Sequence, residues 1–228
     1  MRSLRIFAGV ADGLVAAILA SEADGVVLDL VGEDARAAAC AVLRCVNAGG
    51  GRPAIWMRAG GLHPDPSDDD LAAVLPAHPA AVVLPAVAGP EDIEQLGARL
   101  RVLEARLGRP DGETRIVAVI GTAAGVMAAP RLRPHPRLAA FVWEPFLLPG
   151  AETPDGDVSR LSRGLTLLAA SHAGVPAIDA SARAGQEDAA FREACLRARR
   201  DGFAAMTARN EAQVHVINAV FAGDGAPD

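Results

Sequence analysis

One pattern recurs eight times along this 228-residue chain: a short apolar run, a turn, and then a segment of helical character. The runs are rich in Val, Ile and Leu and do not alternate with polar residues, which is typical of strands buried on both faces of a parallel sheet. Eight strands alternating with about eight helices predict an α/β fold, a short (β/α)₈ TIM barrel. We expect strands at residues 4–7, 25–30, 54–58, 80–84, 115–120, 139–143, 175–179 and 203–207.

The clearest helical segments cover residues 34–46, 90–107, 160–173 and 188–200. A doubly wound sheet is the alternative fold, and the absence of a G-x-G-x-x-G pattern after the first strand argues against it. We expect one barrel domain over residues 1–222, with flexible segments at 49–52 and 149–157 and a flexible tail at 223–228.

Composition excludes several classes of function. The net charge of −6 and the pI near 5.4, with no basic run, argue against nucleic-acid or anionic-membrane binding. All 22 basic residues are arginine, and there is no tyrosine. Arginine stays protonated, so Schiff-base chemistry, a P-loop lysine and a tyrosine general acid are all excluded.

The three cysteines form no C-x-x-C pair, which argues against a disulfide framework and a cysteine-type zinc site. They are best interpreted as reduced thiols, and we expect a cytoplasmic protein. No apolar run reaches membrane-spanning length. The apolar stretch near the N-terminus is interrupted by Asp12, so we expect folded protein there and not a signal peptide.

In a barrel, catalytic groups lie at the carboxyl ends of the strands. The polar residues at these positions are few: Asp29, Arg58, Glu144, Asp179, Thr207 and Asn210. Arg58 stands out, because an arginine facing a barrel mouth is costly unless it meets an anion. That anion is either a ligand carboxylate or Asp29 on the neighbouring strand, and the two interpretations are compatible.

Two acidic clusters are candidate metal sites with ordinary alternatives. Glu33 and Asp34 can bind a cation, or they can form the acidic first turn of a helix. The run HPDPSDDD at residues 63–70 holds one histidine and four carboxylates. It is better explained by a proline-fixed turn, a Ser67 N-cap and an acidic helix start.

A series of short motifs runs in order from residue 2 to about residue 221. Residues 2–4 (RSL) and 27–30 (VLDL) are similar to the pattern RSLLFVPG…ADAVILDLED. Residues 56–58 (WMR) resemble W-V-R-V-N, residues 82–85 (VVLP) resemble V-V-L-P-K, and residues 176–179 (PAID) resemble P-A-I-D-G. Together they resemble the HpcH/HpaI aldolase and citrate lyase β-subunit (CitE-like) family, over nearly the whole chain.

The resemblance implies a TIM barrel, usually a homo-oligomer, that makes or cleaves carbon–carbon bonds next to a carbonyl. It implies oxo acids or acyl-CoA thioesters as substrates. It also implies Mg²⁺ held by one or two carboxylates to stabilise an enolate, with an arginine holding the substrate carboxylate.

The chain departs from the family at the positions that bind metal. The glutamate of the family motif I-E-T corresponds to Gly121, and the aspartate of G-A-E-D-L corresponds to Leu147. Mg²⁺ requires hard oxygen ligands in near-octahedral geometry, so these residues do not hold it. The acids that could substitute are Glu33, Asp34 and Glu144.

Two functions follow. In the first, the chain is a carbon–carbon lyase with a rebuilt or metal-independent site, in which Arg58, Asp29 and Glu144 are catalytic and Arg58, Asp179 and Asn210 bind substrate. In the second, it is a non-catalytic partner subunit or a protein that binds a small carboxylate or acyl-CoA thioester through Arg58. The second needs no replacement for the missing ligands.

Overall fold

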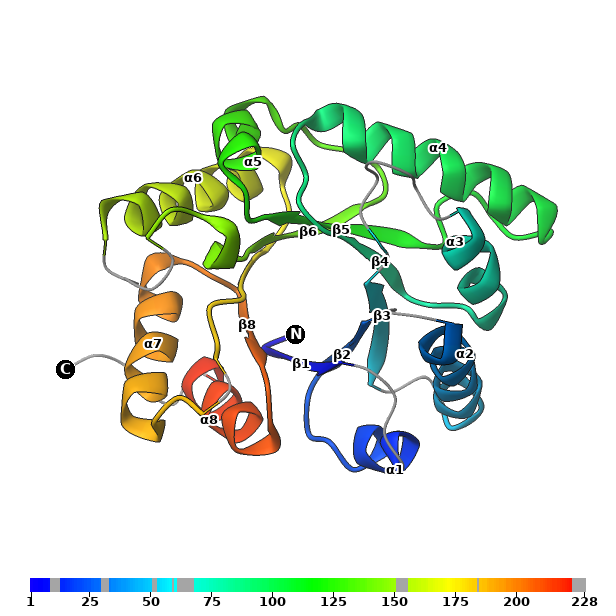
Figure 1. The fold of residues 1–228 in the computed structure, drawn as a ribbon, viewed down its shortest axis with the longest axis horizontal. Coiled ribbons are helices and arrows are strands. Elements are labelled where there is room, and N and C mark those ends of the chain that lie inside the picture. Colours follow the sequence, from blue (N-terminus) through cyan, green and yellow to red (C-terminus); the bar gives the residue numbers. More distant parts are fainter. Residues whose placement is uncertain are drawn as a thin grey trace.

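The structure is a computed structural model, and it describes residues 1–8, 13–29, 33–50, 53–58, 60, 68–150, 156–183 and 185–222. Eight parallel strands close into a barrel in chain order, with β8 paired back to β1. Figure 1 looks into this ring and shows the helices surrounding it. The strands are β1 (Ser3–Ala8), β2 (Gly25–Asp29), β3 (Ala54–Arg58), β4 (Ala81–Leu84), β5 (Arg115–Ile120), β6 (Leu138–Trp143), β7 (Ala177–Asp179) and β8 (Ala205–Ala208). The predicted TIM barrel is confirmed.

The outer ring holds eight α-helices among the described residues, and within them no helix is long and apolar enough to cross a membrane. The α-helices are α1 (Leu14–Leu19), α2 (Glu33–Ala48), α3 (Asp68–Val74), α4 (Pro90–Arg106), α5 (Ala123–Ala128), α6 (Asp157–Ala173), α7 (Asp188–Asp201) and α8 (Glu211–Phe221). The structure also has short 3₁₀ turns, which are η1 (Leu75–Ala77), η2 (Ala129–Arg131) and η3 (Pro145–Leu147). The tail 223–228 and much of the two predicted flexible segments lie outside the described residues.

Two strands begin two residues later than the sequence predicts, and β4 begins one residue later, at Ala81. β7 begins at Ala177, because Pro176 has no N–H to donate and contributes only its carbonyl, which accepts from Phe141. β8 begins at Ala205, because the Phe203 amide bonds to the Ala198 carbonyl and closes the end of α7. The apolar residues just before β7 and β8 therefore belong to the turn between helix and strand, and not to the strand.

Side chains alternate between two cores along each strand. One set fills the barrel lumen: Leu4, Ile6, Val27, Trp56, Ala81, Val83, Val117, Val119, Ala140, Val142, Ile178, Ala180 and Ala205. The other set points outward and packs against the helices. A buried parallel sheet uses both faces in this way, which explains why its strands read as continuous apolar runs.

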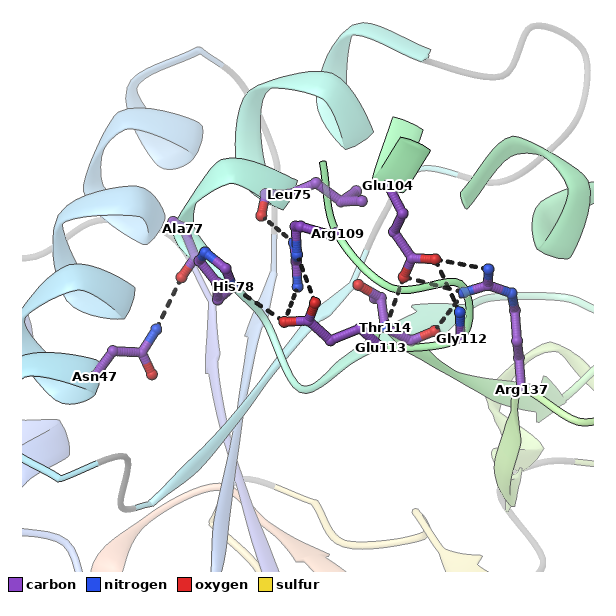
Figure 2. Close-up of polar contacts among 10 residues, drawn as sticks. All are labelled: Asn47, Leu75, Ala77, His78, Glu104, Arg109, Gly112, Glu113, Thr114 and Arg137. Atoms are coloured by element: carbon purple, nitrogen blue, oxygen red, sulfur yellow. Dashed lines mark hydrogen bonds and ion pairs between the residues drawn. The ribbon is translucent and has the colours of Figure 1, made fainter. Parts of the chain in front are cut away.

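A buried ion pair joins α4 to β5 and β6 at the amino ends of the strands (Figure 2). The two amino groups of Arg137 donate to the Glu104 carboxylate at 3.1 and 2.7 Å. The backbone amides of Gly112 and Thr114 donate to the same carboxylate at 3.0 and 2.7 Å. Burial opposes ionisation of Glu104, but these hydrogen bonds outweigh it and lower the pKa of the carboxyl.

A second polar contact at the same end is more exposed. Arg109 donates to both oxygens of Glu113, at 3.0 and 2.7 Å, and to the Leu75 carbonyl at 2.7 Å. His78 lies 3.1 Å from Glu113 (Figure 2). The hydrogen bonds from Arg109 lower the pKa of Glu113 to about 2. These contacts hold the base of the barrel together, where stability and not catalysis is the usual role of polar residues.

Candidate functional site

The alternation of the strands places three charged groups at the carboxyl end of the lumen. Val27 and Trp56 belong to the lumen core, so Asp29 and Arg58, two residues further along β2 and β3, share their inward register. Val142 likewise points inward, and Glu144 follows two residues later, directly after β6. The apolar lumen therefore ends in a charged layer at the end of the barrel where TIM-barrel enzymes place their active sites.

Arg58 and Glu144 form a bidentate ion pair across the barrel. The two amino groups of Arg58 donate to the two carboxylate oxygens of Glu144, at 3.0 and 2.7 Å. Both side chains are largely buried, with 21% and 13% exposed. These hydrogen bonds, together with the charges of Glu144 and Asp29, raise the pKa of the Arg58 guanidinium. The arginine stays charged, as a carboxylate-binding group must.

A small cavity of about 20 Å³ lies beneath this pair, bounded by Arg58, Glu144 and Thr207 and closed below by lumen residues such as Trp56 and Val119. That volume corresponds to about one water molecule. The hydroxyl of Thr207 is buried and has no hydrogen-bond partner among the described residues. A buried hydroxyl without a partner costs free energy, so it marks a place where a ligand or water can bind.

The suggested ion pair between Arg58 and Asp29 is not the one that forms. Asp29 and Arg58 are register partners on adjacent strands, yet both hydrogen bonds found for the guanidinium go to Glu144. The arginine extends across the lumen toward β6 and not sideways toward β2. Asp29 acts on Arg58 through its charge alone, which helps to raise the pKa of the guanidinium.

Asp179 does not join this group. It is 1% exposed, and its carboxylate accepts hydrogen bonds from Arg163 on α6 and from the Ser181 amide. Ile178 and Ala180 fill the lumen on either side, so Asp179 points outward between β7 and the helices. The predicted substrate contact is replaced by a buried ion pair between strand and helix.

Asn210 caps a helix instead of contacting the mouth. Its side-chain oxygen accepts from the Gln213 amide at 2.9 Å at the start of α8. Gln213 reaches back and accepts from the Arg209 amide at 2.7 Å. An asparagine followed three residues later by glutamine is a readable N-cap signal, and it explains this residue without a ligand.

The described residues do not fit Mg²⁺. A Cβ built on Gly121 would lie 2.6 Å from the Glu144 carbonyl, so β6 has closed over the place of the family's glutamate side chain. Leu147 is 70% exposed and apolar. Within the described parts of the chain, no three His, Cys, Asp or Glu side chains come together as a metal site. The side chains of Glu33, of Asp34 and of the cluster at residues 63–70 lie outside the described set.

The sequence analysis gave no role to two polar residues, Thr207 and Arg163. Thr207 was named only as one of the polar residues at strand ends, because its lack of a hydrogen-bond partner depends on what packs beside it. Arg163 was missed, although its spacing from Ser159 and Thr166 places it on one helix face with them. Arg163 also contacts the aromatic rings of Trp143 and Phe203, at 5.2 and 4.4 Å from their centroids.

Two proteins of Cereibacter sphaeroides are similar to this chain in sequence. A (3S)-malyl-CoA thioesterase of Cereibacter sphaeroides is 28% identical over 169 residues, which are 72% of this chain and 55% of that protein. The protein of the same name from a second strain is 27% identical over 213 residues, covering 90% of this chain and 71% of the relative. The chain thus spans little more than half the length of the first of these relatives.

Solved structures show the same barrel. The citrate lyase β subunit of Mycobacterium tuberculosis superposes with a TM-score of 0.76 at 22% identity, over 97% of both chains. The malate synthase of Haloferax volcanii superposes with a TM-score of 0.79 at 18% identity, over 96% of this chain and 72% of that one. The family model for HpcH/HpaI aldolase/citrate lyase matches residues 5–211. The barrel and this match agree, and the chain belongs to the HpcH/HpaI aldolase/citrate lyase family.

Proposed function

We propose that this chain binds a small carboxylate-bearing molecule, an oxo acid or an acyl thioester, at the barrel mouth through Arg58 and without the family's metal. The observation that carries the proposal is the bidentate pair of Arg58 and Glu144 at the carboxyl ends of the strands. A guanidinium held in this geometry matches the two oxygens of any carboxylate. Glu144 then occupies the position that a ligand carboxylate would take.

Glu144 acts as an internal competitor in this proposal. The cavity of about 20 Å³ is too small for an oxo acid, so the ligand must displace the glutamate side chain from the arginine. Thr207 offers its unpartnered hydroxyl to the incoming molecule. Asp29 keeps the guanidinium charged. Asp179 and Asn210 are left out, because Arg163 and the start of α8 engage them.

The names of the relatives support this ligand class. The Cereibacter proteins are named for malyl-CoA, and the Haloferax malate synthase has been solved with pyruvate and acetyl-CoA. We also propose that the protein is a homo-oligomer of the cytoplasm. Its three cysteines are free, which suits a reducing compartment.

Calorimetric titration with oxalate, in the presence and absence of Mn²⁺, tests the proposal. We expect metal-independent binding to the unmodified protein and none to Arg58→Ala. Glu144→Gln should bind oxalate roughly tenfold more tightly, because the competing carboxylate has lost its charge. Arg101→Ala removes an exposed arginine of α4 and serves as the charge-matched control, with binding unchanged. Binding that survives in Arg58→Ala, or that requires Mn²⁺, contradicts the proposal.

A metal-independent lyase is the second candidate, and one observation favours it: two carboxylates, Asp29 and Glu144, act on one arginine. In that case Glu144, released by the substrate, would transfer the proton during bond cleavage. An assay of oxo-acid and acyl-CoA cleavage decides between the two. Turnover that is lost in Glu144→Gln while oxalate binding persists supports the lyase, and no turnover in the unmodified protein supports the binding protein.

A further inference from the structure

Helix α6 leaves apolar side chains on its outer face. The face turned to the barrel is made of small and polar residues: Ser159, Ser162, Arg163, Thr166, Ala169, Ala170 and Ala173. Leu165 and Leu167 are partly buried and pack against the core. The opposite face carries Val158, Leu161 and Leu168, which are 45%, 62% and 68% exposed. A helix on the surface of a barrel normally turns its apolar stripe inward, but these three side chains face solvent.

Polar bonds fix this orientation. The Trp143 indole of β6 donates to the Ser162 hydroxyl of α6 at 3.0 Å. Arg163 is paired with Asp179 and, at 3.0 Å, with Asp201. Turning Leu161 and Leu168 inward would leave the buried polar groups of α6 without their partners, which is strongly destabilising. The exposed apolar face is therefore a fixed feature of the folded chain.

Gly164 lies between the two leucines on this face. It is in the interior of the helix, where glycine is less favourable than alanine. A Cβ built there would meet no atom within 4 Å, so nothing in this chain requires the glycine. A backbone without a side chain allows another helix to approach closely, which gives the glycine a purpose outside the chain.

The neighbouring helices extend the apolar surface. α5 and α7 flank α6 in the outer ring (Figure 1). α5 carries Met127, which is 78% exposed, and α7 carries Leu196, which is 38% exposed. A stable interface buries roughly 800 Å² per partner, more than a single helix face supplies, so an interface centred on α6 must also draw on these neighbouring helices.

We propose that the outer face of α6 pairs with the same face of a second copy of this chain, antiparallel, about a two-fold axis between Gly164 and Leu165. The pair Leu161 and Leu168 has its midpoint there, and so does the pair Asp157 and His172. One axis thus sets leucine against leucine and, at each rim, His172 of one copy against Asp157 of the other, which also pairs with Arg160 of its own helix at 2.6 Å. Such self-complementarity is what an isologous interface requires.

The first experiment measures the mass of the full chain by analytical ultracentrifugation across a concentration series. We expect an assembly that Leu161→Glu/Leu168→Glu weakens by roughly 100-fold or more, because both leucines lie at its centre. The control Leu19→Glu/Val102→Glu adds the same charge at exposed apolar sites on α1 and α4, and should assemble like the unmodified chain. Circular dichroism confirms that each variant is folded.

A chain that is monomeric at roughly 100 μM, or an assembly that keeps its mass in the Leu161→Glu/Leu168→Glu variant, overturns the proposal. A folded variant that loses mass supports it. If that variant fails to fold, Gly164→Leu is measured instead, since its side chain enters open space within the chain and would separate only the two copies.

Cross-linking tests the antiparallel arrangement. The exposed Cys45 is replaced by serine, and Leu161→Cys and Leu168→Cys are introduced into separate chains. In the proposed dimer, residue 161 of one copy lies opposite residue 168 of the other, while the two copies of residue 161 are about 10 Å apart along the axis. A disulfide needs Cα atoms within about 7 Å. The mixed chains should therefore cross-link and Leu161→Cys alone should not, whereas the reverse result overturns the arrangement.

Discussion

Two buried arginine–glutamate pairs stand at opposite ends of the barrel. Arg137 and Glu104, at the amino ends of the strands, are 3% and 0% exposed, and Glu104 accepts four hydrogen bonds. Arg58 and Glu144, at the carboxyl ends, retain partial exposure, and the hydrogen bonds found for the Glu144 carboxylate among the described residues come from Arg58 alone. The same chemical pair is saturated at one end and incompletely satisfied at the other.

That difference separates a structural role from a binding role. Each carboxylate oxygen of Glu104 accepts two hydrogen bonds, whereas each oxygen of Glu144 accepts one from the residues that the structure describes, so a ligand has nothing to gain by displacing Glu104. At the mouth, a small cavity and the unpartnered hydroxyl of Thr207 adjoin the ion pair. A ligand that replaces Glu144 can satisfy both the arginine and the threonine. The Thr114 hydroxyl beside Glu104 is also buried without a partner among the described residues, so the candidate site is marked by the incompletely satisfied ion pair and the cavity next to it, and not by an unpartnered hydroxyl alone.

The largest expected effect comes from the saturated pair. Arg137→Ala should lower the free energy of unfolding by ~3–5 kcal/mol, because Glu104 is left buried with an uncompensated charge. Arg58→Ala should cost less, ~1–2 kcal/mol, because Glu144 keeps some contact with water. Urea unfolding at neutral pH measures both. Equal losses would remove the distinction between the two ends.

Two threonine substitutions should have smaller effects on the free energy of unfolding, in opposite directions. Thr207→Val removes a hydroxyl without a partner and should raise the free energy of unfolding by about 1 kcal/mol. Thr166→Val is the matched control, since its hydroxyl bonds to the Ser162 carbonyl, and should lower stability by about 1 kcal/mol. Thermal unfolding of the two variants is the measurement. A loss of stability in Thr207→Val would show that the hydroxyl is satisfied and would argue against a vacant binding position.

The smallest effect is acid sensitivity at the base of the barrel. Arg109 lowers the pKa of Glu113 from 4.5 to about 2, so the contact stabilises the fold above pH 4.5 and is lost as the pH falls toward 2. Glu113 is 36% exposed, so solvent and salt weaken the contribution. Glu113→Gln should flatten the fall in urea midpoint over this range. An identical fall in both proteins would assign acid sensitivity elsewhere, Glu104 being the next candidate.

Much of the fold can be predicted from the amino-acid sequence. Continuous apolar runs predict the eight strands, because strands buried on both faces need no alternation. The errors fall where an apolar residue serves another purpose, as at Pro176 and Phe203, which belong to turns. The site is harder to predict. Arg58 and Glu144 were both chosen as strand-end residues, but their ion pair was not foreseen. Asp179 and Asn210 proved to have local hydrogen-bond partners.

The sequence by itself determined the barrel and the short set of polar strand ends, because these depend on residue type and order, and its resemblance to the family predicts that Gly121 and Leu147 stand in the place of metal ligands. Only the tertiary structure decided which side chains meet. Closure of the barrel sets Arg58 opposite Glu144, 86 residues away in the chain. The same packing leaves the Thr207 hydroxyl without a partner among the described residues and turns Leu161 and Leu168 of α6 outward. Distances across a closed sheet, and the side of a helix that polar contacts hold inward, are fixed by the assembled fold and not by local spacing.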